Sequence, residues 1–235
     1  MMKRITLSLT CLLFIFSVGY AQNVQQGSFM NSENLSFLEG MTKDVLEASR
    51  IYPGQFISKD IGSNNTGGTL IRPGGRDAYP SFWIRDYAMS LETGMVSKKE
   101  QLHMLLLTAS TQCDQTLITK GGSLIPLGSI ADHIRIDDSK PICFPGTYSD
   151  ENQGTPEFGM LPPYCDQFYF VHMAYYYVKS TGDRKILKQE INGARLIDRL
   201  KAAFHVPPAN NDNHIVFATD AIRGVDFGFR DVITI

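Results

Sequence analysis

An indole, a guanidinium and a carboxylate fall within four consecutive residues, Trp83-Ile84-Arg85-Asp86, and Trp83 is the only tryptophan of the chain. A flat aromatic ring stacks on the apolar face of a pyranose, while Arg and Asp make charge-assisted hydrogen bonds to ring hydroxyls. This combination predicts a sugar-binding site. Tyr79, just before it, and Gln167, in a later aromatic segment, are further candidates to line the pocket.

Each of these residues also has a purely structural interpretation. Ser81 is a suitable helix N-cap, and Asp86 is an acid in a first helical turn, where the helix dipole favours negative charge. Trp83, Tyr87 and Leu91 recur at a spacing of four and would form a core stripe. Both interpretations stay open at this point.

The whole pattern, Trp83-Ile84-Arg85-Asp86 after an aromatic loop that contains Pro80, resembles the segment that opens the substrate pocket in glucoamylases and related enzymes. Those enzymes are built on an (α/α)6 toroid of six helical hairpins. The resemblance implies that Arg85 and Asp86 hold the terminal sugar rather than cleave the bond. It also implies a mainly α fold of helical hairpins, with long loops and minor β structure.

Glycoside hydrolysis generally uses two carboxyl groups, one as an acid and one as a base or nucleophile. By the same resemblance the acid lies ahead of an inner helix, where Asp166 and Glu151 are the catalytic candidates. Asp166 adjoins an apolar segment, so loss of water there would raise its pKa toward the range of a general acid. An ordinary N-cap role for Asp166 and a solvated loop position for Glu151 are the structural alternatives. The resemblance places the second carboxylate in a later part of the fold.

The elements that must position these residues follow from periodicity and capping signals. The sequence predicts helices over about 32–50, 82–92 and 97–113, the last beginning at a Ser97 and Glu100 capping box. Residues 53–80 and 115–164 are rich in Gly and Pro and are predicted to be loops with short strands, such as 123–125 and 133–136.

Two further helices are predicted near the C-terminal side. Residues 167–178 are apolar or aromatic nearly all round, which indicates a helix buried on most sides and ended by Gly182. Residues 184–204 carry apolar side chains at helical spacing after a potential N-cap, Asp183. Since a toroid needs many more helices, the sequence is expected to hold an incomplete toroid, the N-terminal part of such a domain, over residues 32–235.

Composition narrows the function further. A net charge of -2 and a pI of about 6.2 give no electrostatic footprint for binding nucleic acid or an anionic membrane, whereas a neutral carbohydrate ligand would fit. The five histidines are scattered, so neither a metal site nor a cofactor is expected.

The N-terminus predicts an exported protein. Lys3 and Arg4 precede an apolar run, and small residues end at Ala21, as in a signal peptide over residues 1–21, which a polar lead over 22–31 follows. We therefore expect a periplasmic or extracellular location, with no membrane span in the mature chain. Three cysteines would remain, of which Cys143 and Cys165 are the preferred disulfide pair.

Two other functions fit parts of the pattern. A non-catalytic glycan-binding protein would need the aromatic and polar binding residues but not the second carboxylate. A polysaccharide lyase or sugar epimerase would need a Tyr/His or His/His pair, for which the sequence around His133 and His172 gives no signal.

Overall fold

The computed structural model describes residues 31–73, 79–145, 154–156, 159–209, 212–213, 215–216, 219 and 222–225. The chain divides into two units, Met1–Met41 and Thr42–Ile235. The helices of the described part are α2 (Ser32–Ser49), α3 (Ile84–Ser90), α4 (Lys98–Ser110), α5 (Tyr164–Thr181) and α6 (Leu196–Phe204), with the 3-10 helices η2 (Leu91–Thr93) and η3 (Arg184–Lys188).

The strands are short and pair only antiparallel among the described residues. They are β1 (Arg50–Ile51), β2 (Phe56–Ser58), β3 (Gly62–Ser63), β4 (Leu70–Ile71), β5 (Ser81–Trp83), β6 (Leu117–Ile118), β7 (Leu124–Ile125), β8 (His133–Arg135), β9 (Pro141–Ile142), β10 (Glu190–Ile191) and β11 (Ala194–Arg195). Four sheets have two strands each (β1-β4, β2-β3, β6-β7 and β10-β11), and β5-β8-β9 has three.

This architecture shows that the predicted fold class is wrong. The described residues form a mixed α and β arrangement, and not the mainly α hairpins of an (α/α)6 toroid. The physical reason is that several segments between the helices pair as short antiparallel strands. The segment from Ser81 to Trp83, expected at the start of a helix, is the first strand of the three-stranded sheet.

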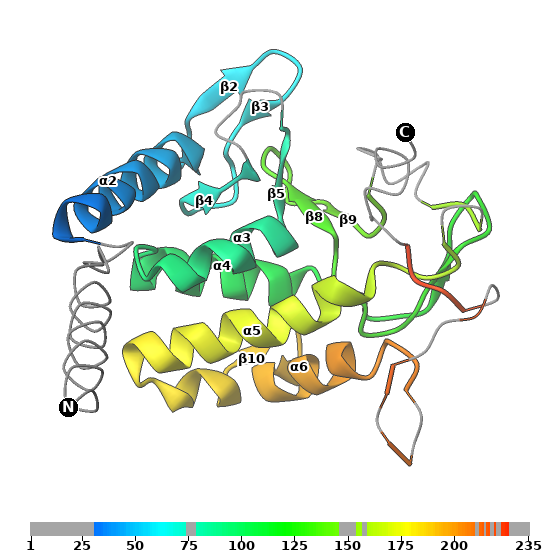
Figure 1. The fold of residues 1–235 in the computed structure, drawn as a ribbon. Coiled ribbons are helices and arrows are strands. Elements are labelled where there is room, and N and C mark those ends of the chain that lie inside the picture. The colour runs from blue at the N-terminus through cyan, green and yellow to red at the C-terminus, as the bar shows by residue number, and fades with distance from the viewer. Residues whose placement is uncertain are drawn as a thin grey trace, which may run out of the picture. The chain divides into compact units, whose positions relative to one another are not determined.

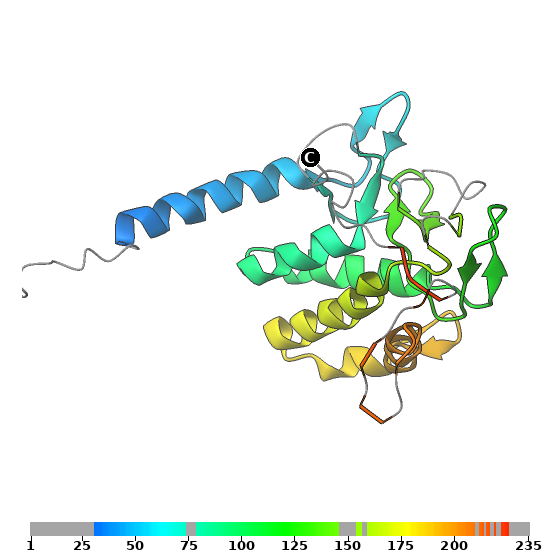
Figure 2. The same cartoon turned by 45° about the vertical axis from the view of Figure 1, so that its right-hand side comes forward.

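Helix α5 is central to the second unit. It packs against α3 and α4 on one side and against α6 on the other, as the two views of the ribbon show (Figures 1 and 2). Its buried face includes Phe170, Met173, Ala174 and Tyr177, while Tyr175 is 57% exposed. The expectation that this helix is buried on most sides is therefore too strong, because aromatic residues also cover its solvent face.

Several predicted helix ends are confirmed by their capping groups. Ser97 accepts a hydrogen bond from the Glu100 backbone N–H, and Glu100 accepts one from Ser97 N–H, which completes the capping box of α4. Gly94 after η2 and Gly182 after α5 both take the left-handed conformation that glycine adopts without strain.

The single helix predicted over residues 184–204 is wrong, because three elements occupy this range. Asp183 caps the short η3, accepting from Lys185 N–H at 2.9 Å. A hairpin of β10 and β11 follows, whose turn residues Asn192 and Gly193 have positive φ angles of 47° and 78°. Asn-Gly suits such a two-residue turn, and its local geometry overrides the helical spacing of the surrounding apolar residues.

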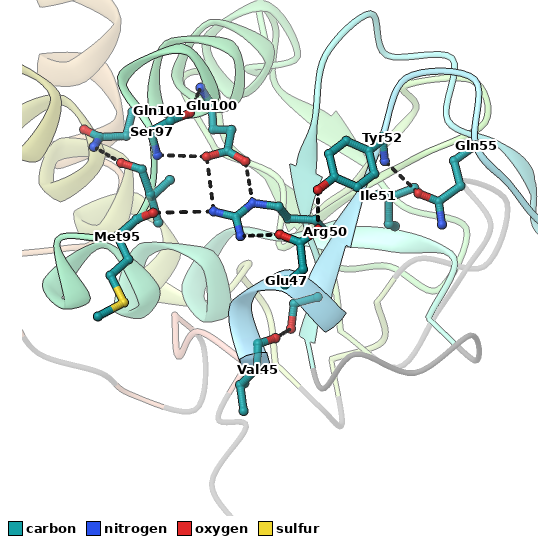
Figure 3. A network of polar contacts seen from close by, with 12 residues as sticks. Val45, Glu47, Arg50, Ile51, Tyr52, Gln55, Met95, Ser97, Glu100 and Gln101 are labelled. Carbon is teal, nitrogen blue, oxygen red and sulfur yellow. Dashed lines mark hydrogen bonds and ion pairs between the residues drawn. The ribbon is translucent and has the colours of Figure 1, made fainter. Parts of the chain in front are cut away.

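A partly buried ion pair joins Arg50, the residue after α2, to the first turn of α4 (Figure 3). Arg50 Nε donates to Glu100 Oε1 at 2.7 Å, and Arg50 Nη1 donates to Glu47 Oε2 at 3.0 Å. Burial alone would raise the pKa of Glu100, but the hydrogen bonds from Arg50 and Ser97 outweigh it and lower the pKa. Glu100 thus takes part in the cap of α4 and also binds the segment at Arg50.

The predicted helix over residues 32–50 is confirmed as α2, but most of its predicted apolar face is not covered. Leu46 is buried, whereas Leu35, Leu38, Met41 and Val45 are exposed. None of the helices in the described ranges combines the length and the apolar character that a membrane crossing requires. The predicted signal peptide and, apart from Asn31, the predicted polar lead lie outside the described residues.

Candidate functional site

Strand pairing places Trp83 against a histidine. In the register of β5 and β8, Trp83 lies opposite His133, so the two side chains share one face of the sheet. Their rings stack with centroids 4.6 Å apart and planes 18° apart, and Tyr79 meets the indole edge-on at 5.2 Å. The sheet thus holds Trp83, which remains half-buried, in a fixed orientation.

The same pairing fixes where helix α3 begins. Ile84 N–H donates to Asp132 O at 3.0 Å, which continues the ladder by one residue and satisfies a backbone donor of the first turn. Trp83 takes the N-cap position without a side-chain cap, and Ser81 is a buried strand residue. Ser81 is therefore not the N-cap that one interpretation of the sequence suggested.

Asp132 and His133 form a buried pair behind the indole. His133 Nδ1 lies 2.7 Å from Asp132 Oδ2, and the histidine has no exposed surface. With Nδ1 as the donor, the carboxylate fixes the orientation of the imidazole ring on which Trp83 stacks.

Asp166 is a buried carboxyl group in the first turn of α5. The residue is 1% exposed, its Oδ2 has no hydrogen-bond partner, and Cys165 Sγ lies 3.9 Å from its Oδ1. Burial, reinforced by the charges of Asp132 and Asp86, raises its pKa well above the usual value, although Arg85 opposes this shift. Because the N-cap of α5 is Pro163, Asp166 does not serve as the helix cap.

Arg85 and Asp86, on the first turn of α3, are the more accessible charged groups. Burial would lower the pKa of Arg85, but Cys165, Asp166 and the other nearby acids raise it. Asp86 is exposed as a residue, yet partial loss of water around its carboxyl raises its pKa against the effect of Arg85. Three separate segments therefore bring Arg85 close to carboxyl groups, and the charges there shift the pKa of Arg85, Asp86 and Asp166.

Gln167 is placed differently from a pocket-lining residue. Its side chain is buried, its Oε1 accepts from Ile130 N–H at 2.8 Å, and its Nε2 donates to Ile130 O at 3.4 Å and Pro163 O at 3.3 Å. These bonds hold the start of α5 to the loop that leads into Asp132.

The structure thus gathers the predicted residues Trp83, Arg85, Asp86 and Asp166, with Tyr79 against the indole. Glu151, the other predicted catalytic residue, lies outside the described residues. Asp132, His133 and Cys165 also lie beside these residues, and the sequence analysis did not predict any of the three as a site residue. An acid next to a histidine at the start of an extended segment was the available signal for the first two.

We refer below to Trp83, Arg85, Asp86, Asp132, His133 and Asp166 as the carboxyl cluster. It has an accessible layer, formed by Trp83, Arg85 and Asp86, and a buried layer, formed by Asp132, His133 and Asp166. In the part of the chain that the structure describes, no three His, Cys, Asp or Glu side chains converge in a way that could hold a metal ion.

No family model, curated protein or solved structure matches this chain. The functional argument therefore depends on the geometry of the carboxyl cluster.

Proposed function

We propose that the carboxyl cluster binds a neutral sugar and that the chain is a glycoside hydrolase-type domain in which Asp166 is the general acid. The observation that carries this proposal is the burial of the Asp166 carboxyl, whose Oδ2 has no hydrogen-bond partner, next to Asp132 and Asp86; burial and these charges raise its pKa. A general acid must keep its proton at the working pH, and a carboxyl group does so only where water is excluded or like charges are near.

The accessible layer supplies the groups that recognise a sugar. The indole of Trp83, held by His133 and Tyr79, offers a rigid aromatic surface. Arg85 and Asp86, in the first turn of α3, offer a donor and an acceptor for hydroxyl groups. A neutral oligosaccharide or polysaccharide is the substrate class that this combination favours.

Glycoside cleavage also needs a second carboxyl group. Asp86 and Asp132 are near enough to Asp166 to affect its ionisation. Either can act on water or on the anomeric carbon once a sugar is bound, so the second group need not come from another part of the fold. Glu151 stays a predicted alternative.

Export remains part of this proposal. The signal-like residues 1–21 would deliver the chain to the periplasm or the extracellular space, where polymeric carbohydrate is met.

The test is hydrolysis of a panel of aryl glycosides and neutral oligosaccharides by the full chain. Asp166→Asn should abolish product release, and Trp83→Ala should weaken binding measured by calorimetry. Two variants control for general effects: Asp60→Asn removes an exposed turn carboxyl, and Phe56→Ala removes an exposed aromatic ring. If Asp166→Asn retains full turnover, Asp166 is not the acid.

A second function is glycan binding without catalysis, which the near-complete burial of Asp166 favours. In that case the wild-type chain binds oligosaccharide and releases no product. Trp83→Ala then loses binding while Asp166→Asn keeps it, because only the accessible layer contacts the ligand.

A further inference from the structure

Cys113 and Cys143, about 30 residues apart in the sequence, are brought to the same segment of backbone. This segment is residues 128–132. The backbone N–H of Cys113 donates to Ser129 O, and the backbone C=O of Cys113 accepts from Gly128 N–H, both at 2.9 Å. Cys143 directly follows β9, whose Ile142 O accepts from Asp132 N–H at 2.8 Å. Residues 128–132 therefore hold both cysteines.

The two side chains also meet. Cys113 packs against a small buried cluster of Ile125, Cys143 and Phe144, and a hydrogen bond links the two thiols. None of the three cysteines that the structure describes, Cys113, Cys143 and Cys165, is in a disulfide. The thiol contact is between Cys113 and Cys143, not between the sequence-preferred pair of Cys143 and Cys165.

We propose that Cys113 and Cys143 are a redox pair that forms a disulfide by exchange with an external disulfide, such as a small-molecule disulfide or an oxidising dithiol protein. The Cys113 thiolate attacks one sulfur of the external disulfide, giving a mixed disulfide and releasing one thiolate. The Cys143 thiolate then attacks the Cys113 sulfur and expels the second thiolate. The two cysteines lose two protons and two electrons, and the external disulfide is reduced to two thiols.

The order of attack follows from access and acidity. Cys113 is half-buried, and the hydrogen bond from Cys143 lowers its pKa, so it is the thiol that an external reagent reaches. Cys143 is buried, and the interaction with Cys113 and the loss of water raise its pKa well above the usual value. Cys143 therefore reacts only after Cys113 has formed the mixed disulfide, and it attacks the Cys113 sulfur.

Cys165 is a poor competitor for either sulfur. Its thiol lies 3.9 Å from Asp166 Oδ1, and burial raises its pKa to about 11. It stays protonated at neutral pH and engaged with the carboxyl cluster. This inference is independent of sugar binding, because it depends only on the cysteines and residues 128–132.

The experiment uses the full chain, reduced with dithiothreitol, desalted and then incubated with oxidised glutathione. Remaining thiols are alkylated, and peptides are mapped by mass spectrometry without reduction. We expect a Cys113–Cys143 crosslinked peptide and alkylated Cys165. A crosslink from Cys165 to either partner, or alkylation of both Cys113 and Cys143 in the folded oxidised sample, would overturn the proposal.

Three variants separate the two steps. Cys165→Ser should form the same crosslink as the wild type, which provides a test even where other variants fold poorly. Cys143→Ser should accumulate glutathione on Cys113, because the resolving thiol is gone. Cys113→Ser should take up no glutathione at Cys143, and rapid glutathionylation of Cys143 in a folded sample contradicts the order of attack.

Discussion

The charge state of Asp166 leads to a prediction about stability that needs no substrate. Its folded-state pKa is raised, so in the folded protein the group binds a proton that it releases on unfolding. The stabilisation is complete below the unfolded-state pKa of about 3.9 and is lost as pH rises through the folded-state pKa. Between these two values the free energy of unfolding should fall by about 1.4 kcal/mol per pH unit.

The perturbation is Asp166→Asn, which keeps the shape of the side chain and removes the titration. The amide brings an N–H that lacks a partner, so the absolute stability of the variant carries a constant offset of about 1–3 kcal/mol. The dependence on pH is free of this offset. We therefore expect the free energy of unfolding of the variant to rise relative to that of the wild type as pH rises.

The assay is urea unfolding of both proteins at pH 5, 6, 7 and 8. The groups that face Asp166 are Asp132 before β8, Arg85 and Asp86 on α3, and Cys165 on its own helix, and all are present in both proteins. Asp60→Asn is the control, because it removes an exposed charge far from this environment in sequence. If the free energies of unfolding of wild type and Asp166→Asn change with pH in parallel, the assignment of a protonated Asp166 is refuted.

Three other predictions concern the framework. Glu100→Gln should lower the free energy of unfolding by about 2 kcal/mol at pH 7, because Arg50 and the α4 cap lose a charged partner. Since the folded-state pKa of Glu100 is lowered, the free energies of unfolding of variant and wild type, measured with urea, should converge as pH falls through that pKa. A difference that stays constant with pH contradicts this. Gly182→Ala should lower the free energy of unfolding by about 1 kcal/mol, because φ is +74° and nothing lies within 4 Å of the new Cβ, so the cost comes from the backbone conformation alone. An unchanged free energy of unfolding, measured with heat or urea, would contradict the left-handed cap. Oxidation of Cys113 and Cys143 should add about 3–4 kcal/mol to the free energy of unfolding compared with a sample in dithiothreitol, and equal urea midpoints would rule out a constraint on the unfolded chain.

Local signals predicted the parts of the fold that local chemistry determines. Ser97 with Glu100 marked the start of α4, and Gly182 with Asp183 marked the end of α5 and the cap of the next element. These features depend on a few neighbouring residues, so one sequence suffices. The Asn192 turn was equally local but was obscured by apolar residues at a spacing that also fits a helix.

The rest depends on contacts between distant residues. The pairing of Trp83 with His133 joins strands about 50 residues apart, and its register decides which side chains share a face. For this reason the toroid was wrong, although Trp83, Arg85, Asp86 and Asp166 do come together. The position of Asp132 beside them follows from the same pairing, and its place next to a histidine at the start of an extended segment was the only local signal for it.

The amide of Gln167 does for the loop at Ile130 what a neighbouring strand would do, since it pairs with both the N–H and the C=O of one residue. These hydrogen bonds join α5 to the loop next to both carboxyl groups, because Asp166 precedes Gln167 and Asp132 lies two residues after Ile130. The hydrogen bonds of Gln167 therefore maintain the closeness of Asp132 to Asp166, which contributes to the raised pKa of Asp166.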